Sequence, residues 1–253
     1  MQITGSSAIV TGAASGLGAA TATTLAGAGV RVIGFDLAPG WERAGTPADG
    51  ITPTSGDVTS AIDVAAAVAA AVAVGPLRMA VNCAGIGTAG RVLSRKGPHD
   101  LDVFGRVISV NLIGTFNVLR LAAEAIAATD PVDQQGQRGL IVNTASIAAF
   151  DGQIGQIAYS ASKGGVVGMT LPAARDLAQF GIRVMTIAPG ILDTPMLAGV
   201  TDEIRGALAA SVPFPARLGL PVEYAALVLS IAAQDYLNGE VIRLDGSLRM
   251  APR

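Results

Sequence analysis

The sequence has only one cysteine, Cys83, and only one histidine, His99. A single cysteine cannot form a disulfide within the chain, and one cysteine with one histidine cannot supply a Cys/His zinc site. We therefore predict no bound metal and no need for an oxidising compartment. Charge is scarce as well: 14% of the residues are charged and the net charge is -2. This balance argues against nucleic acid as a partner.

Long hydrophobic runs are also missing. Residues 64–77 carry no charge, but they are mostly alanine and are interrupted by Gly75-Pro76. They fall short of the ~20 apolar residues that span a bilayer, so we interpret them as a buried helix. The first five residues lack the basic region and apolar run of a secretory leader. We therefore expect a cytoplasmic protein that does not enter a membrane.

The chain does contain enough apolar material for one large core, because 51% of its 253 residues are hydrophobic. Short apolar runs alternate with helical segments, which is typical of parallel strands joined by crossover helices. The pattern predicts strands near residues 8–10, 30–35, 51–53, 79–82, 140–142, 183–187 and 240–244, and helices over 16–27, 63–73, 100–129 and 158–180. These elements predict one doubly wound sheet with helices on both faces, whose ligands bind where the strands end.

Two local features depend on proline and glycine. Residues 39–50 are rich in glycine, proline and alanine, and this composition predicts a loop with little room for a helix. Pro172 falls inside the last long helix. Because proline costs roughly 3 kcal/mol in a helix interior, we expect it to kink or interrupt that helix.

A glycine-rich turn, TGAASGLG at residues 11–18, follows the first strand and opens the first helix. Glycines let the backbone approach a pyrophosphate, and the helix start offers unpaired N–H groups. The spacing is GxxxGxG, which an ordinary strand-to-helix turn would also allow. Asp36, at the end of the second strand, favours the dinucleotide because a carboxylate there accepts hydrogen bonds from ribose hydroxyls. Asp36 would also repel a 2′-phosphate, which favours NAD over NADP. The alternative is a solvated aspartate at a strand end.

Three further side chains point to proton transfer. Tyr159 and Lys163 stand four residues apart on a predicted helix and so share a face, while Ser146 ends the strand before it. Moving a hydride between an alcohol and a nicotinamide requires a proton to move as well. An ammonium about 4 Å from a phenol, at an effective dielectric of about 20, is worth about 4 kcal/mol. We therefore expect Lys163 to lower the pKa of Tyr159, and Ser146 to donate to the substrate oxygen.

Asn111 lies within a predicted helix. A polar amide there could hold a water for proton relay, and the alternative is a satisfied core asparagine.

Taken together, these motifs resemble the short-chain dehydrogenase/reductase family. The matching residues, in order, are TGAASGLG at 11–18, Asp36, Asp57-Val58, NCAG at 82–85, Asn111, Ser146, YSASK at 159–163 and PG at 189–190. The resemblance implies an α/β fold with one Rossmann-like domain, residues 1–253, a mostly parallel seven-stranded sheet, and NAD as cofactor. It implies Asn111, Ser146, Tyr159 and Lys163 as catalytic residues. The cofactor residues it implies are Gly12, Ser15, Gly16, Leu17, Gly18, Asp36, Asp57, Val58, Cys83, Ala84, Gly85, Tyr159, Lys163, Pro189, Leu192 and Thr194.

Residues 136–190, 212–219 and 237–250 are similar to the branch of this family that interconverts L-3-hydroxyacyl-CoA and 3-ketoacyl-CoA esters. This similarity implies fatty acid metabolism, an acyl-CoA substrate and a homotetramer. A hydroxysteroid or other secondary-alcohol dehydrogenase is the alternative, since fold does not settle substrate. A non-catalytic NAD-binding scaffold is a third interpretation, and it has no need of Tyr159 beside Lys163.

Substrate contacts are expected outside the cofactor motifs. Residues 191–217 combine apolar and small side chains and form a candidate substrate loop that closes over an acyl chain, although core packing is an equal alternative. The resemblance adds Gln156, Ser146 and Tyr159 as substrate contacts. Arg95 and Lys96 lie in a basic loop that either contacts coenzyme A phosphates or is simply solvated.

Overall fold

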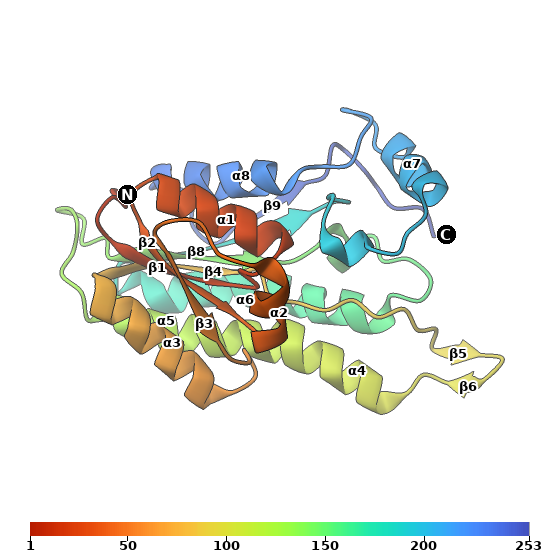
Figure 1. Cartoon of the computed structure of the whole chain (residues 1–253), viewed down its shortest axis with the longest axis horizontal. Helices are drawn as coiled ribbons and strands as arrows, with labels where there is room; N and C mark the ends of the chain where they lie inside the picture. Colours follow the sequence, from red (N-terminus) through yellow and green to blue (C-terminus); the bar gives the residue numbers. More distant parts are fainter. Residues whose placement is uncertain (253) are drawn as a thin grey trace.

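The computed structural model describes residues 1–252, and within them seven parallel strands form one sheet in the order β3-β2-β1-β4-β7-β8-β9 (Figure 1). The strands are β1 (Ser7–Thr11), β2 (Arg31–Asp36), β3 (Ile51–Ser55), β4 (Leu77–Asn82), β7 (Gly139–Thr144), β8 (Ile182–Pro189) and β9 (Val241–Leu244). Every pair of neighbours is parallel. The predicted doubly wound sheet is confirmed.

Helices cover both faces of this sheet (Figure 1). On one face lie α1 (Gly16–Gly27) and α8 (Pro221–Ala233), which pack on each other and on a core of buried strand residues that includes Val10 and Val142. On the other face lie α3 (Ala61–Val74), α5 (Thr115–Ala127) and α6 (Ile157–Ala178). Central strands β4 and β7 are buried along their whole length, which is why they read as unbroken apolar runs.

The order of the strands reverses between β1 and β4, because the chain first moves outward to β2 and β3 and then returns to the other side of β1. At such a switch point the connections after the two strands diverge and leave a crevice at their carboxyl ends. The loops after β1, β4, β7 and β8 therefore meet at one edge of the sheet.

The predicted helix over residues 100–129 is present as α4 (Leu101–Ile108), a π-helical segment η1 (Ser109–Gly114) and α5. Taken as one helix, Leu101–Ala127 is long and apolar enough to cross a membrane, and half of its most apolar window is buried. A buried core helix can have the same length and apolar composition as a membrane-spanning helix. In this structure its buried side packs on β4 and β7.

Residues 39–50 correct the sequence prediction, because they include most of a short helix, α2 (Ala38–Ala44), where a loop was expected. Proline is tolerated in the first turn of a helix, so Pro39 does not prevent it. The helix is anchored by Trp41, whose ring lies against the backbone of Gly34 and whose Nε1 donates to the carbonyl of Thr54 at 3.1 Å.

Pro172 does not interrupt α6, which runs unbroken for 22 residues. Tertiary packing compensates for the hydrogen bond that proline cannot make. Val166, Thr170 and Ala174 are buried on the side that faces β8, and the hydroxyls of Thr170 and Thr186 are hydrogen-bonded at 2.7 Å. The expected interruption was therefore wrong.

Several short segments gather beyond the carboxyl edge of the sheet (Figure 1). They are the hairpin β5 (Leu93–Ser94) and β6 (Gly97–Pro98), the 3-10 turns η2 (Ile147–Ala149) and η3 (Pro195–Leu197), and α7 (Asp202–Ala210). The C-terminal segment lies at the same end of the molecule. These segments surround the crevice with elements that the sheet itself does not supply.

Candidate active site

A cavity of about 940 Å³ opens at the carboxyl edge of the sheet. Most of the side chains predicted from sequence line it. They are Gly12, Ser15, Gly16, Leu17, Gly18, Asp36, Asp57, Val58, Cys83, Ala84, Gly85, Ser146, Gln156, Tyr159, Lys163, Pro189, Leu192 and Thr194. The structure therefore brings together residues from the first strand to the loop after β8, whereas Asn111, Arg95 and Lys96 are not in the lining.

The glycine turn packs so tightly that side chains are excluded at two positions. A Cβ on Gly18 would lie 2.1 Å from the carbonyl oxygen of Gly12. Gly12 itself has φ +67, and a Cβ there would lie 2.9 Å from the nitrogen of Ala84. Helix α1 then begins with Ser15 as its N-cap, with no side-chain cap and no acidic residue in the first turn. The first N–H groups of this helix, next to the cavity lining, suit an anion such as a pyrophosphate.

Asp36 holds the turn from the end of β2. Its Oδ2 accepts from the backbone N–H of Ala14 at 2.9 Å, and its Oδ1 accepts from that of Leu37 at 2.7 Å. A carboxylate offers about four acceptor sites, so about two remain for ribose hydroxyls. Asp57 also accepts two hydrogen bonds, both at Oδ1, from the backbone N–H and the hydroxyl of Thr59 at 2.8 Å.

Lys163 is a buried lysine, with 3% of its surface exposed. Its Nζ donates to the carbonyl of Thr144 at 2.7 Å and lies 5.8 Å from the centre of the Tyr159 ring. Burial lowers the pKa of Lys163 to about 8, because the charged form is deprived of water. Proton gain and loss at Lys163 therefore fall close to neutral pH.

Tyr159 differs from the sequence expectation. Burial raises the pKa of its phenol above the ordinary value, and the Ser146 hydroxyl opposes that rise. We expected Lys163 to lower the pKa of Tyr159, and that expectation is wrong, because the loss of water around the phenolate raises this pKa more than the Ser146 hydroxyl lowers it. Tyr159 is a protonated phenol at neutral pH and is suited to donate a proton.

Ser146 begins the turn after β7 and caps η2, where its Oγ accepts from the backbone N–H of Ala148 at 3.1 Å. That contact uses a lone pair of the oxygen and leaves its proton free to donate. Gln156 lines the cavity at the start of α6, and its Oε1 accepts from the backbone N–H of Gln153 at 2.9 Å.

Asn111 is completely buried in the π-helical segment η1. Its amide accepts from the N–H of Ile86 at 2.8 Å and donates to the carbonyl of Ile86 at 2.9 Å and to the hydroxyl of Ser162 at 3.0 Å. These contacts favour the interpretation as a satisfied core asparagine that fixes the loop after β4. For this amide to donate to a water, one of the two hydrogen bonds that it donates would have to break.

Arg95 and Lys96 are exposed at the turn of the β5–β6 hairpin. The hairpin stands at the same end of the molecule as the cavity but outside its lining, so any contact with a ligand would be with a part that extends out of the cavity.

Sequence reasoning missed several lining residues that come from helices and loops without a motif. They are Ile86, Gly87, Arg106, Ser109, Ile147 and Met250. Met196 and Leu197 of the predicted substrate loop, residues 191–217, also line the cavity. Met250 comes from the C-terminal segment, where no pattern announces a role.

No group of three or more His, Cys, Asp or Glu residues that would suit a metal ion occurs within residues 1–252.

Comparison with known proteins matches residues 6–205 to the family described as short chain dehydrogenase. The chain is 54% identical to 3-hydroxyacyl-CoA dehydrogenase type-2 of Bos taurus, over 99% of this chain and 98% of that protein. It is 37% identical to ipsdienol dehydrogenase of Ips pini, over 95% and 96% of the two chains. Among solved structures, 3-hydroxyacyl-CoA dehydrogenase type-2 from Mycobacterium avium superposes with a TM-score of 0.91 at 46% identity, covering 98% of both chains.

Proposed function

Because this chain belongs to the short-chain dehydrogenase family, and is an oxidoreductase by that membership, we propose that it transfers hydride between NAD(H) and the 3-position of an L-3-hydroxyacyl-CoA or 3-ketoacyl-CoA ester. One observation carries the chemistry of the proposal. Ser146, Tyr159 and Lys163 line the same cavity as the glycine turn.

The described residues fit the nicotinamide cofactor that dehydrogenases of this family imply. Gly12 and Gly18 leave no room for side chains in the turn, and the start of α1 has no competing cap, so the turn would hold the pyrophosphate. Lys163 would hold the nicotinamide ribose. When bound, the oxidised nicotinamide would supply a hydride acceptor and a positive charge.

We assign the proton to Tyr159. In reduction its phenol donates to the carbonyl oxygen of the substrate, and in oxidation the phenolate takes that proton back. The Ser146 hydroxyl donates to the same substrate oxygen and holds it toward Tyr159. Lys163 stabilises the phenolate while it is protonated itself, which its pKa of about 8 permits at neutral pH.

Asp36 supports NAD as the preferred cofactor. Its carboxylate is fixed by two backbone N–H groups at the end of β2, where the adenosine ribose is expected. A 2′-phosphate at this position would meet a negative charge that cannot turn away.

The acyl-CoA substrate rests on the 54% identical relative and on the apolar lining of the cavity beside Ser146. Ile147, Ile191, Met196 and Met250 contribute to this part of the lining, and we propose that residues 191–217 close over the acyl chain. Arg95 and Lys96 would contact the phosphates of coenzyme A outside the cavity.

A second candidate is a hydroxysteroid or other secondary-alcohol dehydrogenase on the same site. The 37% identical relative, ipsdienol dehydrogenase, supports it because its name indicates an alcohol substrate without coenzyme A. A non-catalytic scaffold has no support in the site, since binding alone does not require a buried ammonium beside a phenol that lines the cavity.

The test is a substrate panel. Acetoacetyl-CoA, longer 3-ketoacyl-CoA esters, ketosteroids and simple ketones are offered with NADH, and oxidation of NADH is followed by its absorbance. We expect the highest kcat/KM with a CoA ester. If the protein turned over ketosteroids or simple ketones but none of the CoA esters, the second candidate would replace the acyl-CoA proposal.

We propose a homotetramer that works in the cytoplasm in fatty acid metabolism. Several apolar side chains on or beside the helices that flank the sheet are exposed, among them Ile113, Phe116, Leu171 and Phe180. Their exposure supports burial of these side chains against other copies of the chain. Sedimentation of the purified protein tests the tetramer.

A further inference from the structure

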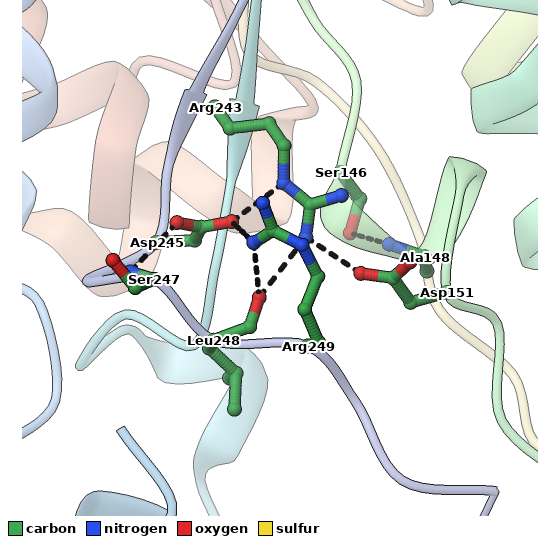
Figure 2. Close-up of polar contacts among 8 residues, drawn as sticks. All are labelled: Ser146, Ala148, Asp151, Arg243, Asp245, Ser247, Leu248 and Arg249. Carbon is green, nitrogen blue, oxygen red and sulfur yellow. Dashed lines mark hydrogen bonds and ion pairs between the residues drawn. The ribbon is translucent and has the colours of Figure 1, made fainter. Parts of the chain in front are cut away.

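Arg243, near the end of β9, joins three parts of the chain (Figure 2). Its Nη2 donates to Oδ2 of Asp151 and its Nε donates to Oδ2 of Asp245, both at 2.6 Å. The same Nη2 also donates to the carbonyl of Leu248 at 3.0 Å. Asp151 lies in the loop between Ser146 and Tyr159, whereas Asp245 and Leu248 belong to the C-terminal segment.

The environment of Arg243 makes these contacts stronger than an ordinary surface pair. The Arg243 and Asp151 side chains are 21% and 22% exposed, and that of Asp245 is 7% exposed. The guanidinium also lies over the ring of Phe150, with 5.3 Å between its carbon and the ring centre. Limited contact with water reduces screening, so the ion pairs hold their geometry.

The C-terminal segment, residues 245–252, continues from this cluster along the loop that carries Ser146. It begins with a turn in which Asp245 accepts from the N–H of Ser247, the one residue other than glycine with a positive φ in the described chain. Leu248 is buried against Ile147 and Val212. Two hydrogen bonds then fasten the end of the segment to the loop. Gln153 donates from Nε2 to the carbonyl of Ala251 at 2.9 Å, and the N–H of Ile154 donates to the carbonyl of Pro252 at 3.1 Å.

Met250 lies between the buried Leu248 and the hydrogen-bonded Ala251, and it lines the cavity. It packs on the cluster that contains Ile147, Val212 and Leu248, so it connects the loop after Ser146 with the substrate loop. Met250 thereby adds an apolar side chain to the part of the lining that includes Ile147 and Ile191.

We propose that the C-terminal segment is a wall of the substrate pocket, that Met250 limits the length of the acyl chain, and that Arg243 with Asp151 positions this wall and the Ser146 loop against each other. The assignment rests on the proposed function for the nature of the substrate. Arg243 itself does not line the cavity, so it is a positioning residue.

Arg249 provides a matched control for Arg243. It is also an arginine of this cluster and donates to Asp245 at 3.1 Å, but its side chain is 60% exposed and its other hydrogen bond goes to the adjacent Leu248 carbonyl. Arg243→Gln and Asp151→Asn should each raise KM for acetoacetyl-CoA about tenfold, which corresponds to ~1.4 kcal/mol. The KM for NADH should stay unchanged in both, and Arg249→Gln should resemble the wild type throughout.

Hydrogen exchange gives a readout that does not depend on activity. The amide of Ile154 is fastened to the carbonyl of Pro252 and should exchange faster in Arg243→Gln and Asp151→Asn, while amides of β4 and β7 keep their protection. A double variant should be no worse than the poorer single variant, because both changes remove the same contact. Should Arg243→Gln fail to fold, Asp151→Asn and its exchange profile still decide the matter.

Met250→Ala tests the wall itself. The ratio of kcat/KM for a ten-carbon ester to that for acetoacetyl-CoA should rise at least about fivefold, since a shorter side chain lengthens the pocket. An unchanged ratio together with wild-type exchange and KM in the Arg243 and Asp151 variants would overturn the inference. A wild type inert toward every CoA ester would instead contradict the proposed function, and the exchange data would still report on the contact.

Discussion

The Nζ atom of Lys163 lies 5.8 Å from the centre of the Tyr159 ring, one helical turn away on α6. Lys163 is buried and Tyr159 is partly buried, and loss of water acts on their pKa values in opposite directions. It lowers the pKa of Lys163 to about 8 and raises that of Tyr159. The site thus keeps an ammonium and a protonated phenol side by side, ready for a substrate oxygen that Ser146 can also reach.

Tyr159→Phe keeps the aromatic ring and removes the hydroxyl group that carries the transferred proton. We expect kcat with acetoacetyl-CoA and NADH to fall about 100- to 10,000-fold, which is the usual contribution of a positioned acid. The affinity for NADH, measured by its fluorescence, should change little. Tyr236→Phe is the control, because that tyrosine is fully exposed. Activity that survives in Tyr159→Phe would show that another group moves the proton.

Lys163 should make the stability of the protein depend on pH. Its folded pKa of about 8 is below the ordinary value of 10.5. Between these values the unfolded chain binds more protons than the folded chain, so the contribution of Lys163 to stability rises with pH. The free energy of unfolding of the wild type, relative to Lys163→Met, should increase by up to about 3 kcal/mol between pH 8 and 10.5.

Urea unfolding at a series of pH values measures this difference. Lys96→Met serves as the control for the loss of a lysine, because Lys96 is exposed. A difference between the wild type and Lys163→Met that stays flat across the window, or falls, would mean that the ammonium is not desolvated in the folded protein.

Much of this site was predictable because its signals are local. The central strands are buried on both faces and read as apolar runs, and the glycine turn, Asp36, Ser146, Tyr159 and Lys163 follow strands or open helices directly. Parallel strands place all their carboxyl ends on one edge, so positions in the sequence translated into positions around one cavity.

Other features depend on contacts between distant segments and were not predictable. Helix α2 has no buried residue, so no apolar period marks it, and its anchor is the contact of Trp41 with Gly34. The pKa of Tyr159 depends on how deeply the fold buries it. Arg243 and Asp151 are 92 positions apart, and neither belongs to a motif.

Asp36→Asn should weaken the preference for NAD. The amide keeps one acceptor for the turn but removes the charge that would oppose a 2′-phosphate. We expect the ratio of kcat/KM for NADH to that for NADPH to fall at least about tenfold, a loss of ~1.4 kcal/mol of discrimination. Asp49→Asn, in an exposed loop, is the control. An unchanged ratio would indicate that Asp36 serves only to hold the glycine turn.

Arg95 and Lys96 should matter only for substrates that carry coenzyme A. Replacing both with alanine should raise KM for acetoacetyl-CoA, by about 3- to 10-fold for two exposed ionic contacts, and leave KM for a ketosteroid or simple ketone unchanged. The effect should diminish at high salt because screening weakens exposed pairs. Arg175→Ala, an exposed arginine on α6, controls for net charge. Equal effects on both kinds of substrate would remove these residues from the substrate site.

Deuterium labelling of NADH tests hydride transfer at this cavity. The enzyme is incubated with acetoacetyl-CoA and NADH that carries deuterium on its reactive carbon, and the product is analysed by mass spectrometry. We expect one deuterium on carbon 3 of 3-hydroxybutyryl-CoA with the wild type and almost none, in the same time, with Tyr159→Phe. Product without deuterium from the wild type, or equal labelling by the two proteins, would contradict this expectation.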